Sequence, residues 1–310
     1  MASRRGFLGG LAWLGAGAAG AWLLRERVFW PTASLDAEAV GESGWLPFAE
    51  ARTPLPLVNV GLNGVTVSAL IDSGAQHSLV DRALAERLEL TEALTPPMIA
   101  YGAGGGGQVG RGADMEIRLG ETTLNRVRAA SLELGPIADP DRGGVGVILG
   151  QDVLQVLVAD IDFPKRRMRF EPRTTHQAPE GARDAAVWKR GRALEARVAM
   201  EGAVIDAVVD TGATAALSLT RSAAERAGLL DGRTERRSTS IVLGGAVEGV
   251  SVRAERLWFS GRTFEDQEVH ILPDGRIPGF PDGLLGLGLL AHERVLLDLG
   301  GGALRMMESA

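Results

Sequence analysis

Apolar and polar positions alternate in the first half of the chain in a way that predicts a β-hairpin. Two apolar segments, residues 57–62 and 65–71, flank the pair Asn63-Gly64. Asn-Gly between alternating segments is the strongest short-range signal for a tight hairpin turn. The second half repeats the arrangement at residues 193–199 and 203–209 around a glycine-containing turn. The pattern therefore predicts the same two-stranded unit twice.

Both hairpins end in an aspartate followed by a hydroxyl residue, a glycine and an alanine. The first copy, residues 67–75, reads VSALIDSGA, and the second, residues 205–213, reads IDAVVDTGA, 138 residues later. The turn glycines Gly64 and Gly202 keep the same offset, so the register matches along the whole hairpin. A long repeat with only two units indicates a duplicated domain and not a solenoid.

Three further pairs of segments repeat in the same order: a short capped helix, an apolar-apolar-Gly triplet, and two strands around a turn. The helix is expected at residues 81–90 and 220–228, and the triplet lies at residues 148–150 and 284–286. The two strands around a turn are expected at residues 160–170 and 296–306. We therefore expect two homologous lobes with a proline-containing, charged linker between them. The expected divisions are an N-terminal segment 1–32, a connector 33–52, a first lobe 53–172, a linker 173–190 and a second lobe 191–310.

These residues resemble the retropepsin-like aspartic proteases, with the unit duplicated in one chain. The features that carry the resemblance are the apolar strand, Asp-[Ser/Thr]-Gly-Ala, a glycine-rich hairpin and the later apolar-apolar-Gly, over roughly residues 55–308. A lone Asp-Ser-Gly is a common turn, but two copies with matching downstream segments are specific. The resemblance implies a mostly β fold of two β-barrel lobes with short helices, related by a pseudo-two-fold axis.

The resemblance also implies a catalytic pair, Asp72 and Asp210, at the junction of the lobes. Two carboxyls in contact do not both ionise readily, so the pair holds one proton. The ionised member accepts a proton from water while the protonated member donates to the scissile carbonyl oxygen. We therefore expect an aspartic endopeptidase that needs no cofactor and no metal. Because one chain supplies both aspartates, we expect it to work as a monomer.

The residues next to the aspartates are expected to support the pair. By resemblance, the hydroxyls of Ser73 and Thr211 join the two loops by hydrogen bonds, and Gly74 and Gly212 permit close backbone approach. The apolar-apolar-Gly triplets would pack behind the loops. Alanine follows each glycine, where a hydroxyl residue would stabilise the charged aspartate. The pair should therefore titrate at higher pH than one with such a hydroxyl, which predicts a mildly acidic optimum.

Two glycine-rich segments between the aspartates and the triplets are candidate flaps over an extended peptide. The residues singled out are Tyr101, Gly104, Gly105 and Gly106 in the first half, and Gly244 and Gly245 in the second. Tyr101, the chain's single tyrosine, could face substrate or pack at the hairpin base. Residues 102–107 also satisfy the dinucleotide pattern G-x-G-x-x-G, but that pattern needs a helix directly after it. Residues 109–119 have the pattern of a strand instead, which argues against a nucleotide site.

Composition excludes several other functions. The 310 residues are 45% apolar and 23% charged, typical of a globular protein, and the net charge of −6 argues against a nucleic-acid partner. The absence of cysteine excludes thiol catalysis and disulfides. The four histidines show no metal-ligand spacing. His77, near the first aspartate loop, could tune the pair or simply be a core or surface residue. The turn Lys165-Arg166-Arg167 is interpreted as a solvated hairpin tip.

The N-terminus indicates export. Residues 3–8, SRRGFL, precede a Gly/Ala/Leu-rich stretch and resemble a bacterial twin-arginine signal. An uncleaved membrane anchor remains open. We therefore expect the protein in the periplasm or at the periplasmic face of the inner membrane, acting on peptide or protein substrates. A peptide-binding or scaffold protein that keeps the fold without turnover is the alternative. An N-terminal pro-part that covers the site is a third possibility, although nothing in residues 25–52 identifies one.

Overall fold

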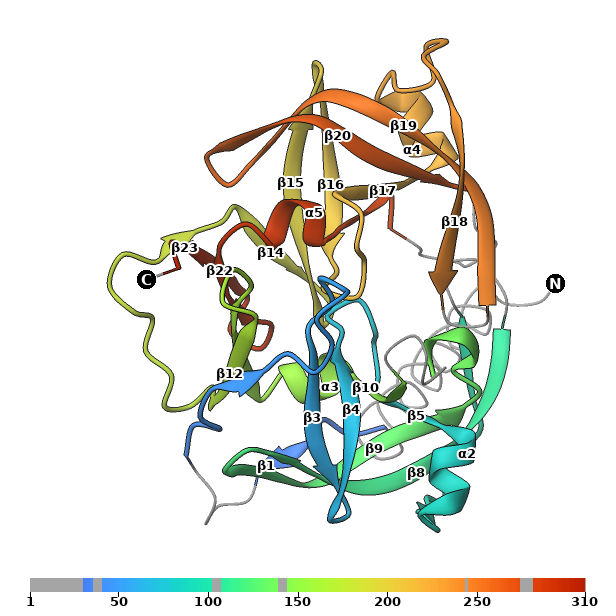
Figure 1. Ribbon diagram of the computed structural model, residues 1–310, viewed down its shortest axis with the longest axis vertical. Helices are drawn as coiled ribbons and strands as arrows, with labels where there is room; N and C mark the ends of the chain where they lie inside the picture. The colour runs from blue at the N-terminus through green and yellow to red at the C-terminus, as the bar shows by residue number, and fades with distance from the viewer. Residues whose placement is uncertain are drawn as a thin grey trace, which may run out of the picture.

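The computed structural model describes residues 30–35, 41–101, 107–138, 144–242, 245–273 and 281–309. The fold is mostly β, with two similar lobes stacked along the long axis, the first running from blue to green and the second from yellow to orange in Figure 1. The predicted fold class is therefore confirmed.

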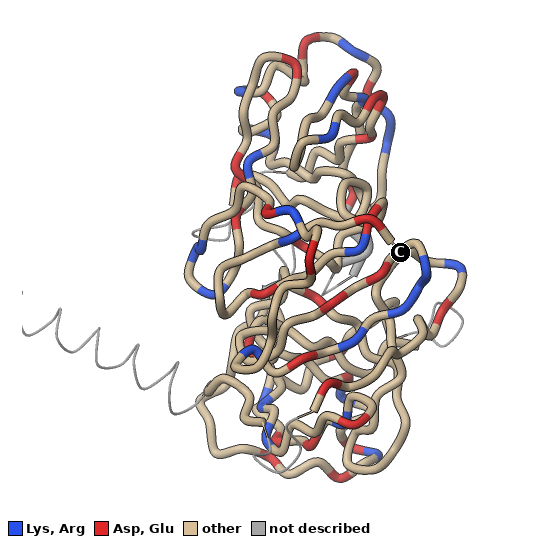
Figure 2. Tube along the Cα trace, turned by 90° about the vertical axis from the view of Figure 1, so that its left-hand side faces the viewer, with Lys and Arg blue, Asp and Glu red and all other residues tan. Residues whose placement is uncertain are grey.

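Lysines and arginines are interspersed with aspartates and glutamates over both lobes (Figure 2).

The first lobe is built on one nine-stranded sheet in which both predicted strands of the hairpin are present. The path β1-β9-β5-β10-β4-β3-β8-β6 is continuous, and β7 pairs with β8. The strands are β1 (Ser34–Leu35), β3 (Leu57–Leu62), β4 (Val65–Ile71), β5 (Leu79–Asp81), β6 (Thr91–Glu92), β7 (Met98–Tyr101), β8 (Gly107–Leu119), β9 (Thr122–Leu132) and β10 (Val145–Leu149).

The second lobe repeats this plan in an eight-stranded sheet of order β14-β15-β16-β21-β17-β20-β19-β18. Its strands are β14 (Val187–Arg190), β15 (Ala193–Met200), β16 (Ala203–Val209), β17 (Leu217–Thr220), β18 (Arg236–Val242), β19 (Gly245–Phe259), β20 (Arg262–Leu272) and β21 (Gly283–Leu285). β14 falls within the predicted linker, yet it pairs with β15. The sheet of the second lobe therefore begins earlier than predicted.

In each lobe a late strand lies between two consecutive early ones. β10 runs parallel to β4 and antiparallel to β5, and β21 stands in the same way between β16 and β17. This arrangement brings the loop after the early strand and the glycine after the late strand to the same end of the sheet. The repeated sequence thus places each aspartate loop directly beside its own apolar-apolar-Gly triplet.

The helices are short and lie at the ends of these strands. They are α2 (Arg82–Arg87), η2 (Gly135–Ile137), α3 (Gln151–Leu154), α4 (Arg221–Arg226) and α5 (Leu287–Leu290). Asp81 and Thr220 cap α2 and α4, as predicted, by accepting backbone N–H groups of the first turn. α2 ends sooner than predicted, because Glu89 adopts a left-handed backbone angle of φ 49°. α4 is terminated by Gly228, as predicted, where the glycine adopts a left-handed angle of φ 72°.

A six-stranded sheet of order β13-β23-β22-β11-β12-β2 joins the lobes. At its centre β11 of the first lobe pairs antiparallel with β22 of the second, with Ala159 opposite Leu297 and Ile161 opposite Val295. The strands are β2 (Leu46–Pro47), β11 (Leu157–Asp162), β12 (Arg167–Pro172), β13 (Arg183–Asp184), β22 (Arg294–Asp298) and β23 (Ala303–Met307). The predicted connector and linker thus both supply strands to this sheet.

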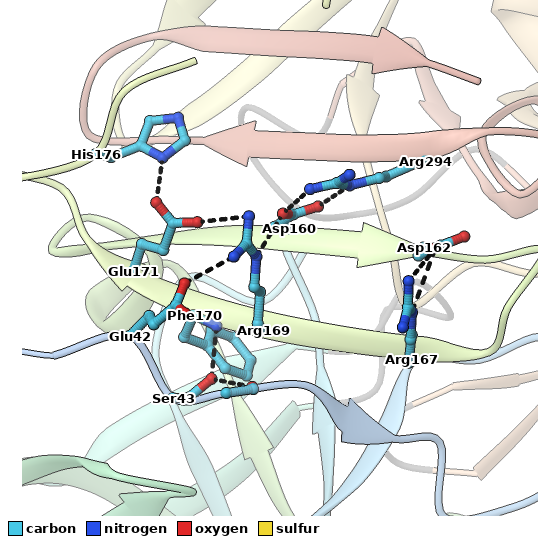
Figure 3. Close-up of polar contacts among 11 residues, drawn as sticks. Glu42, Ser43, Asp160, Asp162, Arg167, Arg169, Phe170, Glu171, His176 and Arg294 are labelled. Carbon is cyan, nitrogen blue, oxygen red and sulfur yellow. Dashed lines mark hydrogen bonds and ion pairs between the residues drawn. The ribbon is translucent and has the colours of Figure 1, made fainter. Parts of the chain in front are cut away.

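Buried charges cross the central strands of this joining sheet. The fully buried carboxylate of Asp160 accepts hydrogen bonds from Arg169 of β12 and from Arg294 of the second lobe, at 2.5–2.8 Å (Figure 3). Arg169 also contacts Glu42 and Glu171, and Glu171 in turn contacts His176. This network links the two lobes through side chains as well as through backbone pairing.

The predicted solvated tip at Lys165-Arg166-Arg167 is wrong for the two arginines. The Arg166 guanidinium donates to the backbone carbonyls of Glu50 and Thr53. Arg167 pairs with Asp162, and its guanidinium lies 4.2 Å from the centre of the Trp45 ring. Both arginines therefore fasten the entry segment of the first lobe to the joining sheet.

No helix within the described ranges is long and apolar enough to span a membrane. The predicted export signal or anchor falls mostly on residues 1–29, which lie outside those ranges.

Candidate active site

Each predicted aspartate follows the last residue of a central strand and is fixed by backbone hydrogen bonding. The Asp72 N–H donates to the Leu149 carbonyl at 3.0 Å, and the Asp210 N–H donates to the Leu285 carbonyl at 2.9 Å. The acceptors belong to β10 and β21, the late strands that lie beside the aspartate strands. The two loops are therefore anchored in equivalent ways, one in each lobe.

The residues after the aspartates join the loops across the lobes. The N–H of Ser73 donates to Thr211 Oγ1 and the N–H of Thr211 donates to Ser73 Oγ, both at 3.0 Å. The Ser73 hydroxyl donates to the Val209 carbonyl and the Thr211 hydroxyl donates to the Ile71 carbonyl, both at 2.7 Å. Ser73 and Thr211 are fully buried, so these four bonds are shielded from water.

The glycines place each carboxyl against the opposite loop. A Cβ added to Gly74 would lie 2.6 Å from Cγ of Asp210, and one added to Gly212 would lie 2.8 Å from Cγ of Asp72. Both distances are shorter than any real Cβ contact, so only glycine fits. Asp72 Oδ1 also accepts the N–H groups of Gly74 and Ala75, at 2.8 and 3.1 Å. Asp210 Oδ1 accepts the N–H of Gly212 at 2.8 Å.

The two carboxyls share an environment that favours retention of a proton. Burial raises the pKa of Asp72, although the N–H groups of Gly74 and Ala75 partly oppose the rise. Burial and the charge of Asp72 together raise the pKa of Asp210 well above its usual range. Because the charge of Asp72 acts on the pKa of Asp210, the two carboxyls titrate as a pair. Arranged in this way, one can donate a proton while the other accepts one.

Residues after the apolar-apolar-Gly triplets hold the loops from behind, and the sequence reasoning missed the most important of them. The side-chain amide of Gln151 donates to the Ser73 carbonyl at 2.9 Å, and its backbone N–H donates to the Ala75 carbonyl at 2.8 Å. In the second lobe the Leu287 N–H donates to the Ala213 carbonyl at 2.8 Å. The sequence signal that could have identified Gln151 and Leu287 is their position directly after the glycine of each apolar-apolar-Gly triplet.

A buried carboxyl lies one residue further on in the first lobe. Asp152 Oδ1 accepts the Ser78 hydroxyl at 2.9 Å, while Ser78 Oγ accepts the N–H of Gly150 at 3.1 Å. Burial raises the pKa of Asp152 to about 6. The corresponding position of the second lobe is Gly288, which leaves no room for a side chain because an added Cβ would lie 2.5 Å from the Ala216 nitrogen. The two lobes therefore support their aspartate loops with different residues.

The candidate flaps are hairpins as far as the structure describes them. β7 and β8 pair from Met98 opposite Gly110 to Tyr101 opposite Gly107. β18 and β19 pair up to Val242 opposite Gly245. Gly104, Gly105, Gly106 and Gly244 lie outside the described residues, so their proposed role stays a prediction. Gly107 begins a strand and not a helix, which leaves the dinucleotide pattern without its required context.

A family model described as aspartyl protease matches the chain twice, over residues 58–153 and 196–289. The two matches together cover more than half of the chain. The chain belongs to the aspartyl protease family. Within that family its unit is retropepsin-like and duplicated, and each match contains one of the two aspartates. No curated protein matches the chain. In the part of the chain that the structure describes, no cluster of three or more histidines and acids could hold a metal ion.

Proposed function

We propose that the chain is an aspartic endopeptidase that hydrolyses peptide bonds with a water activated between Asp72 and Asp210. The observation that carries the proposal is the reciprocal packing of the aspartate loops, in which each carboxyl lies against the glycine of the opposite loop. That packing brings two carboxyls with raised pKa values into contact at the junction of the lobes. A family match at the coarser level of peptide hydrolase supports the same reaction class.

The mechanism uses the single proton that the pair retains. The ionised carboxyl removes a proton from the attacking water, and the protonated carboxyl donates to the oxygen of the scissile carbonyl. The resulting tetrahedral intermediate collapses when the amine nitrogen leaves with a proton from one carboxyl and a hydroxyl of the intermediate gives its proton to the other. Oxygen from water ends on the new carboxyl terminus, and the pair returns to its one-proton state. No covalent intermediate with the protein is formed.

The substrate would be an extended peptide segment lying over the two loops and under the β7–β8 and β18–β19 hairpins. An extended backbone suits this place because hairpin strands offer N–H and C=O groups to a strand-like partner. Both aspartates come from one chain, so the proposal needs no dimer. Residues 3–8 support export by a twin-arginine route, with action in the periplasm or at the periplasmic face of the inner membrane.

Incubation with a random peptide library, followed by mass spectrometry of the products, tests the proposal. The full chain should cleave internal peptide bonds, and Asp210→Asn should retain peptides without cleaving them. Retention without cleavage by the wild type at every pH would favour the alternative of a silent peptide-binding protein. Fusion of residues 1–32 to a reporter that is active only after export tests the location, with Arg4→Lys and Arg5→Lys as the variant that should block it.

A further inference from the structure

Trp30 lies at the start of the described chain and is only 2% exposed, although no sequence pattern had placed it in the fold. It belongs to an apolar cluster of the first lobe that is separate from the main core. The other buried members are Leu57, Leu70, Leu79, Met98, Ala130, Leu132, Leu134, Val145 and Ile148. This second cluster is where a segment from outside the lobe inserts its largest side chain.

One wall of the cluster is formed by the strands that carry the aspartate loop. Leu70 and Ile148 lie in this cluster, whereas their neighbours Ile71 and Leu149 belong to the main core. Since neighbouring side chains on a strand point to opposite faces, Trp30 covers the face of the β4–β10 pair turned away from that core. Ala75, whose N–H donates to Asp72, also packs against the cluster. Trp30 therefore lies beside the catalytic loop.

The opposite wall comes from the first candidate flap. Met98 and Ala100 of β7 pack in the cluster, while Ile99 between them is 54% exposed. The flap strand thus turns its inner face toward Trp30. The ring of His77, which follows the aspartate loop, is tilted by 56° to the Trp30 ring with centroids 5.5 Å apart. Trp30 fills the space between a flap strand and an aspartate loop, and the proposed function places a side chain of a bound peptide in this region.

The segment after Trp30 is fastened through its backbone and through the side chains of Ala33 and Leu35, which pack with the main core. The Ala33 N–H donates to the Asp152 carbonyl at 3.1 Å. Ser34 and Leu35 form β1 and pair with Arg126 and Leu124 of β9. Residues 30–35 thus hold on to the first lobe by backbone pairing, by Trp30 in the second cluster, and by Ala33 and Leu35 against the main core.

We propose that residues 30–35 are a built-in competitor of substrate, with Trp30 occupying a side-chain pocket of the first lobe that prefers large apolar or aromatic residues. This inference rests on the proposed function. It adds a preference for large apolar or aromatic side chains in the substrate and a segment of the chain that limits access of substrate to the site. A tethered group competes at an effective concentration in the millimolar range. Free peptide therefore gains full access only when the segment is displaced or removed, which couples activity to events at the exported N-terminus.

Peptide binding to the full chain tests this inference without relying on turnover. All proteins carry Asp210→Asn, and the probe is a fluorescein-labelled peptide with the sequence of residues 30–35, WPTASL, followed by anisotropy. The Trp30→Ala protein should bind the probe at least about tenfold tighter than the protein that keeps Trp30, because the competing side chain is gone. Trp30→Phe should bind like the unaltered chain, since phenylalanine refills the pocket. A second probe, with alanine in place of its tryptophan, should bind neither the Trp30→Ala protein nor the protein that keeps Trp30.

Trp45→Ala serves as the matched control, because it removes a tryptophan from the joining sheet and leaves the pocket unchanged. It should not increase probe binding. Trp30→Leu removes less apolar volume and should give an intermediate gain in affinity for the probe. It replaces Trp30→Ala in the test if that variant does not fold, which is judged by the absence of a cooperative unfolding transition. If Trp30→Ala or Trp30→Leu folds and binds the probe no better than the unaltered chain, Trp30 is a core residue only and the inference is overturned. Absence of cleavage by Trp30→Ala with Asp210 restored, which carries the intact pair and has lost the competitor, would instead overturn the proposed function.

Discussion

Ser73 and Thr211, which belong to different lobes, each accept the backbone N–H of the other at 3.0 Å. Their hydroxyl protons go to the carbonyls of Val209 and Ile71, the residues that precede the opposite aspartates. Each hydroxyl therefore serves as both donor and acceptor for the loop it does not belong to. The distance between the two carboxyls is thus fixed by buried bonds and not by the pairing of the lobes alone.

Removal of one hydroxyl should weaken both the fold and the active pair. Ser73→Ala leaves the Val209 carbonyl and the Thr211 N–H unpaired, at about 1–3 kcal/mol for each buried group. We expect the free energy of unfolding in urea to fall by about 2–6 kcal/mol. Ser73→Thr is the matched control, because the second copy of the motif carries threonine at this place. A stability of Ser73→Ala equal to that of Ser73→Thr would contradict the role of the hydroxyl.

A single methyl group at Gly74 should impair catalysis more than stability. The new Cβ would lie 2.6 Å from Cγ of Asp210, so the loop or the carboxyl must move. Displacements near 1 Å in an active site cost about 100-fold in rate, which is the expected loss in kcat for Gly74→Ala. Gly41→Ala is the control, since no atom lies within 4 Å of its added Cβ. Unchanged peptide cleavage by Gly74→Ala would show that the carboxyls are not packed as described.

The duplicated lobe could be predicted because its signals are local. The turn at Asn63-Gly64 and the apolar alternation before Asp72 specify a hairpin from neighbouring residues, and β3 and β4 begin and end where predicted. The capping residues Asp81 and Thr220 were likewise visible. The contacts of Gln151 and Asp152 with the first aspartate loop were not visible, because they depend on pairing between strands far apart in the chain.

The segments at the edges of the lobes were hardest to predict for the same reason. Residues 187–190 and 34–35 have linker-like composition and become strands only because an edge of a neighbouring sheet accepts them. The joining sheet is also invisible in local patterns, since β11 and β22 come from different repeats. Trp30 lies inside the predicted N-terminal segment 1–32, to which sequence reasoning assigned no role in the fold.

The buried carboxylate of Asp160 should be necessary for joining the lobes. Asp160→Asn removes the charge that Arg169 and Arg294 share, so Arg294 loses its hydrogen-bonded carboxylate while Arg169 keeps Glu42 and Glu171. Loss of one member of a buried ion network costs about 3–5 kcal/mol, measured as the free energy of unfolding. Asp206→Asn breaks a largely exposed pair with Arg197 and should leave the free energy of unfolding nearly unchanged. Equal losses in the two variants would contradict this assignment.

The rate of peptide cleavage should peak at mildly acidic pH. Activity needs one proton on the pair, so it falls at low pH when the ionised member is protonated and at high pH when the last proton leaves. Burial raises the pKa of both carboxyls, and alanines at positions 75 and 213 offer no side-chain hydroxyl to oppose the rise. Both limbs of a kcat/KM profile should therefore shift upward. A maximum below about pH 3 would contradict this environment of the pair.

The initial rate of cleavage of one library-derived peptide tests the shared role of the two aspartates most directly. It is measured side by side for the wild type, Asp72→Asn, Asp210→Asn and Asp206→Asn. The Asp206→Asn control changes only a surface carboxylate and should leave the rate unchanged. Each active-pair variant should lose at least about 10³-fold, since neither an amide base nor an amide acid can replace its carboxyl. A protein that carries both Asp72→Asn and Asp210→Asn, measured alongside, should be no slower than either single variant, because the two residues act as a unit. A rate within tenfold of the wild type for Asp72→Asn or for Asp210→Asn would contradict the two-aspartate mechanism.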